Sequence, residues 1–172
     1  MNINKLKSAI DSYKDFPQEG IVFRDVLPIL RKPDIFSDLI NKMSSSKVLG
    51  NSDAIIAIDA RGFIFGAAIA FNLSKPLIVA RKPGKLPGKI ISKSYNLEYG
   101  SNSLSIQEES LSEHQTFFII DDLLATGGTV NCVVDIINST GKQITGLSVV
   151  IELKELNAKS KFNFPIESQV IF

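Results

Sequence analysis

The residues from Phe117 to Val130, FFIIDDLLATGGTV, constrain the fold more than any other stretch of this 172-residue chain. Four apolar residues open the stretch, which is enough for a buried strand. Two adjacent aspartates, Asp121 and Asp122, come next, and small and hydroxylated residues occupy 125–129. Beyond them, apolar residues recur at helical spacing, at Val130, Val133, Val134 and Ile137. The sequence therefore predicts a strand, an acidic pair, a glycine loop and a helix, in that order.

The predicted loop has the composition of an anion-binding site. It consists of Ala125, Thr126, Gly127, Gly128 and Thr129. Consecutive glycines let several backbone N–H groups converge on one anion, and the helix N-terminus adds unpaired donors and the positive end of a dipole. The two threonines can add hydroxyl donors, so a doubly charged 5′-phosphate fits this loop. Asp121 and Asp122 would repel that phosphate, so we expect them to face sugar hydroxyls or a hydrated cation a few residues away.

Two common nucleotide-binding motifs are absent from the sequence. No lysine follows the glycines, so the loop is not a Walker loop, and the chain has no G-x-G-x-x-G. The plain alternative is an ordinary strand-to-helix turn whose acids are solvated. The acidic pair directly before A-T-G-G-T argues against that alternative.

Composition narrows the class of protein. The length favours one domain spanning residues 1–172, with 44% apolar and 22% charged residues. A net charge of +1 gives no global basic footprint, so we expect no nucleic-acid partner. No apolar run reaches the length of a membrane span, and the N-terminus lacks the apolar core of a signal peptide. The single cysteine, Cys132, excludes an intrachain disulfide, so the sequence predicts a cytoplasmic protein.

Strands and helices alternate along the middle of the chain, which predicts a largely parallel α/β sheet flanked by helices. The predicted strands are Asp53–Ile58, Pro76–Ala80, Phe117–Ile120 and Gln143–Leu153, and an apolar helix spans Phe63–Leu73. Ligands bind beyond the carboxyl ends of such strands. Three predicted loops leave those ends, beginning at Asp59, Arg81 and Asp121. We therefore expect a single ligand to reach all three loops.

The two ends of the chain show weaker patterns. Ile3, Leu6, Ile10 and Tyr13 predict a short amphipathic helix, and Phe36 to Met43 predict another after Pro33. Val170–Phe172 is consistent with an edge strand. We expect His114, the only histidine, to be exposed and not catalytic, and Cys132 to lie in or near the core.

The longest segment without a clear period is Arg81–Ser103, which predicts a flexible lid or binding loop. It carries prolines, glycines and a concentration of cations, namely Arg81, Lys82, Lys85, Lys89 and Lys93. Any single lysine is readily explained as a solvated surface residue, but their position beside a phosphate loop favours a pyrophosphate-binding lid. Glu98 lies inside the segment and is the acid best placed on a closing lid; the alternative is an ordinary surface carboxylate.

Five segments together resemble the adenine phosphoribosyltransferase family of type I phosphoribosyltransferases. They are FPQEGIVFRD (16–25), DARGFIFG (59–66), RKPGKLPG (81–88), SYNLEYG (94–100) and IIDDLLATGGTVN (119–131). The last is similar to the phosphoribosyl-diphosphate (PRPP) signature that many phosphoribosyltransferases share, whereas the combination with the others is specific to the adenine enzymes. The chain departs from the family at Pro83, where a basic residue is common, and at Ala60, where a serine is often found.

The resemblance implies a reaction and a fold. The reaction converts adenine and PRPP to AMP and pyrophosphate with Mg²⁺, which is bound through PRPP and pyrophosphate and not directly by the protein. The fold is the type I phosphoribosyltransferase fold, with a small hood built from residues 1–30 and the lid, a flexible lid loop over about 81–103 and a PRPP-binding loop over 119–131. The family is usually dimeric, so a homodimer is expected, with the Arg61 region near the subunit contact.

The resemblance also implies roles for individual residues. The 5′-phosphate would bind the Ala125–Thr129 loop, and Asp121 and Asp122 would hold the ribose hydroxyls. Cations would bind the pyrophosphate and assist its departure, namely Arg61, Arg81, Lys82 and Lys85. Glu98 would be the acid/base group at the ring nitrogens. Adenine would be recognised by Val22, Phe23 and Arg24, partly through backbone groups, and by Leu153 on the other side of the ring.

Three other functions remain open at this point. The base could be hypoxanthine, guanine or xanthine, although VFRD argues against this. The chain could be a catalytically silent regulator that senses PRPP or nucleotides, which the near-neutral charge and Glu98 disfavour. A generic nucleotide-binding module would explain the glycine loop but not the lid.

Overall fold

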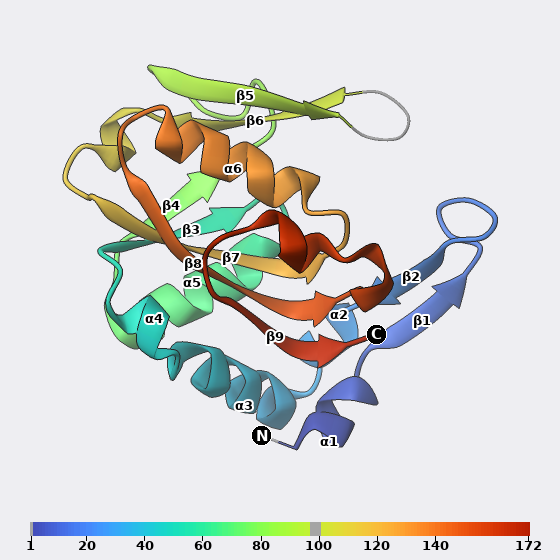
Figure 1. The fold of residues 1–172 in the computed structure, drawn as a ribbon. Coiled ribbons are helices and arrows are strands. Elements are labelled where there is room, and N and C mark those ends of the chain that lie inside the picture. The colour runs from blue at the N-terminus through green and yellow to red at the C-terminus, as the bar shows by residue number, and fades with distance from the viewer. Residues whose placement is uncertain (1, 97–100) are drawn as a thin grey trace.

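A computed structural model describes residues 2–96 and 101–172, and its centre is a five-stranded parallel sheet (Figure 1). The strand order is β4-β3-β7-β8-β9, and every neighbouring pair is parallel. The strands are β3 (Ala54–Ile58), β4 (Leu77–Ala80), β7 (Thr116–Leu124), β8 (Gln143–Glu152) and β9 (Ile166–Ile171). The predicted parallel sheet is therefore confirmed, and β9 is the edge strand that the C-terminal apolar residues predict.

Helices cover both faces of this sheet (Figure 1). On one face lie α3 (Pro33–Ser44) and α5 (Gly62–Leu73), and on the other lies α6 (Gly128–Asn138). Successive side chains of a strand point to opposite faces. Accordingly Phe118 and Ile120 of β7 pack with α3 and α5, while Phe117 and Ile119 pack with α6. The two apolar clusters fix the sheet between its helices and so fix the positions of the loops that leave its carboxyl edge.

Two antiparallel hairpins stand at different places around the sheet. The first pairs β1 (Asp11–Lys14) with β2 (Val22–Asp25), and the second pairs β5 (Ile90–Asn96) with β6 (Ser101–Gln107). Figure 1 shows the second hairpin lying over α6, on the far side of α6 from the sheet. Short helices complete the described chain, namely α1 (Ile3–Lys7), α2 (Leu27–Leu30), α4 (Lys47–Gly50) and the 3-10 turns Glu109–Leu111, Lys154–Leu156 and Ala158–Lys161. No helix in residues 2–96 or 101–172 has the length and apolar character needed to cross a membrane.

Three local predictions were wrong. The N-terminal helix ends at Lys7, and Tyr13 lies in β1 opposite Phe23, because the Phe16–Gly20 turn folds this segment into a hairpin. The segment 81–103 is not irregular throughout, since residues 90–96 form β5 and pair with β6, which begins at Ser101. His114 is half-buried, with its ring edge-on to Phe117 at 6.3 Å.

Candidate active site

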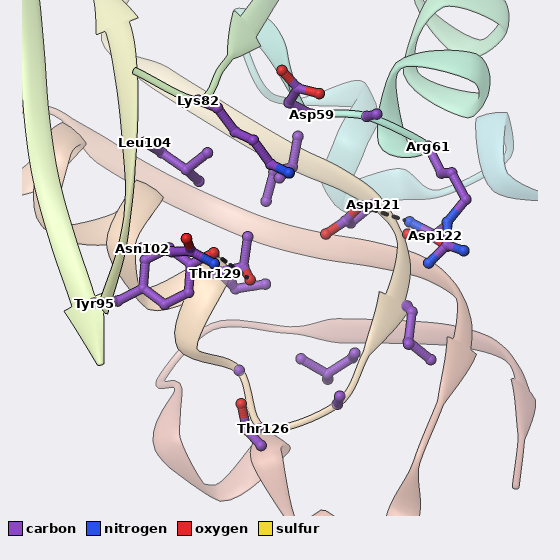
Figure 2. A pocket seen from close by; sticks show the side chains of 17 residues that line it. Asp59, Arg61, Lys82, Tyr95, Asn102, Leu104, Asp121, Asp122, Thr126 and Thr129 are labelled. Carbon is purple, nitrogen blue, oxygen red and sulfur yellow. Dashed lines mark hydrogen bonds and ion pairs between the residues drawn. The ribbon is translucent and has the colours of Figure 1, made fainter. Parts of the chain in front are cut away.

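A pocket of about 420 Å³ opens at the carboxyl edge of the sheet (Figure 2). The loop after β3 contributes Asp59, Ala60 and Arg61, and the segment after β4 contributes Lys82. The third contribution comes from β7 and the glycine loop, and it comprises Asp121, Asp122, Leu123, Leu124, Ala125, Thr126, Gly127, Thr129 and Val130. Residues from all three loops therefore line a single pocket.

The glycine loop connects the buried strand β7 directly to α6. Gly127 precedes the first residue of α6 and has a φ of +82°, a left-handed conformation that favours glycine. A side chain there would also meet the Phe162 ring, which lies 3.1 Å from the position of a Cβ atom. The N–H groups of the first helical turn have no partners within the helix, and the helix dipole is positive at this end. This geometry suits a phosphate group.

Asp121 and Asp122 lie inside β7, not in the loop after it, and both are buried at 8% and 6% exposure. The Asp122 backbone N–H donates to Asp121 Oδ1 at 2.9 Å. Asp122 Oδ2 lies 2.6 Å from Arg61 Nε as a close ion pair, without hydrogen-bond geometry to any group among the described residues. Figure 2 shows the Asp121 carboxylate directed into the pocket and the Asp122 carboxylate beside the guanidinium. The two acids thus face different neighbours.

Burial dominates the electrostatics of this pair. Desolvation, followed by repulsion from Asp122, raises the pKa of Asp121 well above its ordinary value. Desolvation also raises the pKa of Asp122, against the opposing attraction of Arg61. Burial disfavours the ionised form of both acids, and binding of a positively charged group beside them would favour it.

Gly62 allows the first turn of α5 to approach the acid pair. A Cβ atom at Gly62 would lie 2.8 Å from Asp121 Oδ1 and 3.0 Å from the Ile120 carbonyl oxygen. Contacts this short are not sustained by real side chains, so any larger residue would push Arg61 and α5 away from β7. The R-G step in DARGFIFG therefore sets the geometry of the Arg61–Asp122 pair.

The residues predicted to bind the base lie outside the pocket lining. Of this set, Phe23 is the one whose ring meets Arg61, with 5.2 Å between the ring centroid and Arg61 Cζ. Arg24 Nη1 donates to Ser12 Oγ at 2.5 Å, and Arg24 Cζ lies 4.1 Å from the centroid of the Phe172 ring. The Leu153 N–H donates to the carbonyl oxygen of Leu124, which lines the pocket. Val22 is exposed on β2.

The predicted pyrophosphate-binding cations separate into two groups. Arg61 and Lys82 line the pocket, whereas Arg81 and Lys85 do not. Arg81 Nε lies 3.3 Å from Asp59 Oδ2, and its Nη1 donates to the Lys85 carbonyl oxygen at 3.3 Å. Glu98 lies outside the described residues.

Some pocket residues carry no signal in the sequence that points to a ligand. Tyr95, Asn102 and Leu104 come from the second hairpin, which reaches the pocket because it packs on α6. From the C-terminal segment, Lys161 Nζ donates to the carbonyl oxygen of Thr126 at 2.8 Å. Lys161 is 35 residues from Thr126, so only the fold brings the two together.

The donor set of the pocket suits a hydrated magnesium ion that binds together with a substrate phosphate. Residues 2–96 and 101–172 contain no group of three or more His, Cys, Asp or Glu side chains placed to hold a metal. Mg²⁺ commonly keeps several waters and binds through one or two carboxylates plus substrate phosphates. Asp121, whose carboxylate faces the pocket, could meet the hydrated ion of such a complex.

Comparison with known families first defines the class of the chain. Residues 29–165 match the phosphoribosyl transferase domain family, and this range includes the glycine loop and the acid pair. Adenine phosphoribosyltransferase of Prochlorococcus marinus strain MIT 9215 is 62% identical over 167 residues, covering 97% of both chains. The enzyme of Mycoplasmopsis synoviae strain 53 is 44% identical over 168 residues, covering 96% of this chain and 98% of the relative.

Solved structures agree with the sequence relatives. Adenine phosphoribosyltransferase of Saccharomyces cerevisiae, solved with D-2,5-dideoxy-2,5-imino-altritol 1,6-bisphosphate and adenine, has a TM-score of 0.91 and 34% identity and covers 98% of each chain. The Thermoanaerobacter pseudethanolicus enzyme has a TM-score of 0.92 and 36% identity, covering 99% of this chain and 100% of the other. The chain therefore belongs to the adenine phosphoribosyltransferase family.

Proposed function

We propose that the chain transfers the 5-phosphoribosyl group of PRPP to adenine in purine salvage, giving AMP and pyrophosphate. The observation that carries this function is the union, in one pocket, of the glycine loop, the buried acid pair and two cations, Arg61 and Lys82. An ordinary strand-to-helix turn would leave its acids solvated, whereas these two are buried.

The chemistry of PRPP divides between the two ends of the pocket. The 5′-phosphate would accept hydrogen bonds from the Ala125–Thr129 loop at the start of α6. Asp121 would accept from the ribose hydroxyls and stabilise the positive charge that develops on the ring as pyrophosphate leaves. Asp122 would act with it while holding Arg61 in place, which is supported by the 2.6 Å ion pair.

Departure of pyrophosphate needs positive charge at the opposite end. Arg61 and Lys82 supply it from the pocket lining. When bound with PRPP, Mg²⁺ supplies further neutralisation of the leaving group. We propose that Arg81 and Lys85 also bind pyrophosphate, and the Arg81–Asp59 contact would have to change to free the Arg81 guanidinium.

Depletion of Mg²⁺ with a chelator should abolish turnover, and restoration of the ion should recover it.

Adenine would bind between the first hairpin and the carboxyl end of β8. The place of Phe23 in the adenine site is supported by its contact with Arg61. That of Leu153 is supported by the hydrogen bond from its N–H to Leu124, which lines the pocket. Backbone groups of Val22 and Arg24 would distinguish the 6-amino group of adenine from a 6-oxo group, which reverses donor and acceptor.

Glu98 would exchange the proton with the ring nitrogens, so Glu98→Gln should lower kcat by more than tenfold with little change in the KM for PRPP. An unchanged kcat would remove Glu98 from the mechanism.

The test of the function is product formation from PRPP and Mg²⁺ with adenine, hypoxanthine and guanine in parallel. AMP from adenine alone is the expected result. IMP or GMP would retain the PRPP site and overturn the base assignment. Binding of PRPP without any nucleotide product would favour a silent regulator.

We further propose a cytoplasmic homodimer of single-domain subunits, in which residues 1–30 form the hood and about 81–103 the lid. The free, buried Cys132 suits a reducing compartment. The dimer is supported by Phe71 near the end of α5, a large apolar side chain that is 90% exposed. Light scattering should give twice the chain mass, and Phe71→Lys should shift it toward the mass of one chain.

A further inference from the structure

Tyr95 lies at the phosphate end of the pocket, although it belongs to the second hairpin. It is half-buried near the end of β5 and lines the pocket together with Thr129 (Figure 2). Its hydroxyl lies 3.4 Å from Thr129 Oγ1, which donates toward it. The position is 34 residues from Thr129 in the sequence, so neither motif alone indicates that the two hydroxyls meet.

The Tyr95 ring also fits closely against the first turn of α6. A Cβ atom placed on Gly128 would lie 3.2 Å from Tyr95 Cδ2, which is tighter than ordinary van der Waals contact. The ring therefore occupies the space that a side chain at Gly128 would fill. The N–H groups of this turn are the ones that we assign to the 5′-phosphate, so Tyr95 packs directly against that donor set.

The rest of β5 holds Tyr95 in this place. Two residues earlier in the strand, the Lys93 carbonyl oxygen accepts from Cys132 Sγ on α6 at 3.0 Å. Leu104 and Ile106 of β6 are buried in the same apolar cluster as α6. The hairpin is thus fixed to α6 by packing and by this hydrogen bond, and the position of the Tyr95 hydroxyl is set by the scaffold.

We propose that Tyr95 is a positioning residue of the 5′-phosphate site, which rests on the function proposed above. Each hydroxyl has one proton to donate. In the structure, Thr129 donates toward the Tyr95 oxygen at 3.4 Å. A phosphate dianion is a stronger acceptor than a phenol oxygen, so Thr129 turns its proton to the phosphate and its oxygen accepts from Tyr95. The resulting chain from Tyr95 through Thr129 to phosphate orients the Thr129 donor and strengthens it.

The first experiment measures binding of ribose 5-phosphate by calorimetry, because this probe carries the 5′-phosphate and no diphosphate. Tyr95→Phe removes the hydroxyl and keeps the ring, and we expect its Kd to rise about fivefold, the usual worth of one hydrogen bond. Steady-state kinetics should show a similar rise in the KM for PRPP, with kcat and the KM for adenine within twofold. Tyr13→Phe is the matched control, since Tyr13 is exposed on β1, and it should bind as the unmodified chain does.

A double-mutant cycle separates this role from general packing. Thr129→Val removes the intermediate hydroxyl while keeping a branched side chain. If Tyr95 acts through Thr129, adding Tyr95→Phe to Thr129→Val should weaken ribose 5-phosphate binding by less than 1.5-fold. A fivefold loss that persists in the Thr129→Val background would overturn the proposal, and so would a Tyr95→Phe Kd within 1.5-fold of the unmodified value.

The outcomes also separate this inference from the proposed function. If the unmodified chain forms AMP but Tyr95→Phe binds normally, only the role of Tyr95 is wrong. If the unmodified chain neither binds ribose 5-phosphate nor forms AMP, the phosphate site itself is wrong and the proposal for Tyr95 fails with it. Circular dichroism of each variant establishes that the hairpin and α6 are folded before binding is compared.

Discussion

The two antiparallel hairpins beside the pocket are attached to the molecule in different ways. The second hairpin, β5–β6, buries Leu104 and Ile106 against α6 and is held by side-chain packing. The first, β1–β2, has no buried residue in either strand. It meets the rest of the protein through ring and guanidinium contacts, with Phe23 against Arg61 and Arg24 against Phe172. The proposed phosphate side of the pocket is thus built on the core, and the proposed base side is held at the surface.

This difference fits the two tasks of a phosphoribosyl transfer. The 5′-phosphate is a fixed anchor, so its loop benefits from rigid neighbours and preorganised donors. The base must enter and the nucleotide must leave, so a hairpin held by a few surface contacts suits the other end. We therefore expect substitutions on the two sides to affect different kinetic constants.

The strongest test of the phosphate side replaces both acids. Asp121→Asn with Asp122→Asn keeps the size of both side chains but removes the charge that we propose to face the ribose, together with the partner of Arg61. We expect kcat/KM for PRPP to fall by more than 100-fold, since an electrostatic contribution in a buried site is large. Steady-state kinetics with varied PRPP measures this loss. PRPP constants that do not move would contradict the ribose assignment.

The corresponding test of the base side is Phe23→Ala. Removing the ring eliminates its contact with Arg61 and the apolar surface offered to adenine. We expect the KM for adenine to rise about tenfold, equivalent to about 1.4 kcal/mol, while ribose 5-phosphate binds as before. Phe16→Ala is the control, because Phe16 packs edge-on against Phe23 at 5.2 Å and is itself largely exposed. An equal effect of both variants would show that only the fold of the hairpin matters.

The sequence predicts the local structure around the glycine loop far better than that of the first hairpin, for a physical reason. The strand, acid pair, loop and helix are contiguous over 117–130, so hydrophobic periodicity and glycine chemistry are enough to place them. Even there, the extension of β7 through Asp121 and Asp122 is not visible, because two acids rarely continue a buried strand.

Contacts between distant segments account for what the sequence could not predict. Tyr95 and Lys161 reach the glycine loop from 34 and 35 residues away, and only the packing of β5 on α6 and the course of the C-terminal segment bring them there. Local polarity predicts a loop over 81–103, whereas antiparallel pairing with β6 makes residues 90–96 a strand. The family resemblance supplies the role of Glu98 at the ring nitrogens and that of Val22 in base recognition, neither of which a local pattern indicates.

The two sides should also differ in how much a charged site residue lowers the stability of the folded chain. The pKa of Asp121 is raised by burial, so the folded chain binds the Asp121 proton more tightly than the unfolded chain does. Ionisation of Asp121 therefore lowers stability as the pH rises from its ordinary value through the raised one. Asp121→Asn should raise the Tm at pH 7 by about 3 °C, roughly 1 kcal/mol for a chain of this size.

The pH dependence of this gain is the critical observation. Below the ordinary pKa of aspartate the carboxyl is protonated in both states, so the gain in Tm should shrink toward zero there. Thermal unfolding without ligand from pH 3.5 to pH 8 measures the gain in Tm, with Asp25→Asn as control because Asp25 is only half-buried. A gain that does not vary with pH would mean that burial of the charge is not its cause.

The smallest effect concerns Lys161, which contacts the glycine loop from the C-terminal segment. Lys161→Met keeps the length of the side chain but removes both the bond to the Thr126 carbonyl oxygen and a positive charge beside the phosphate. Because Lys161 is exposed, water screens its charge, and we expect the KM for PRPP to rise only about threefold. Lys154→Met, at another exposed lysine of the same segment, should leave it unchanged. The Lys161→Met effect should shrink as salt is raised from 0.05 to 0.5 M, because salt screens the attraction between Lys161 and the phosphate in the unmodified chain. An effect independent of salt would instead assign Lys161 to holding the loop through its hydrogen bond.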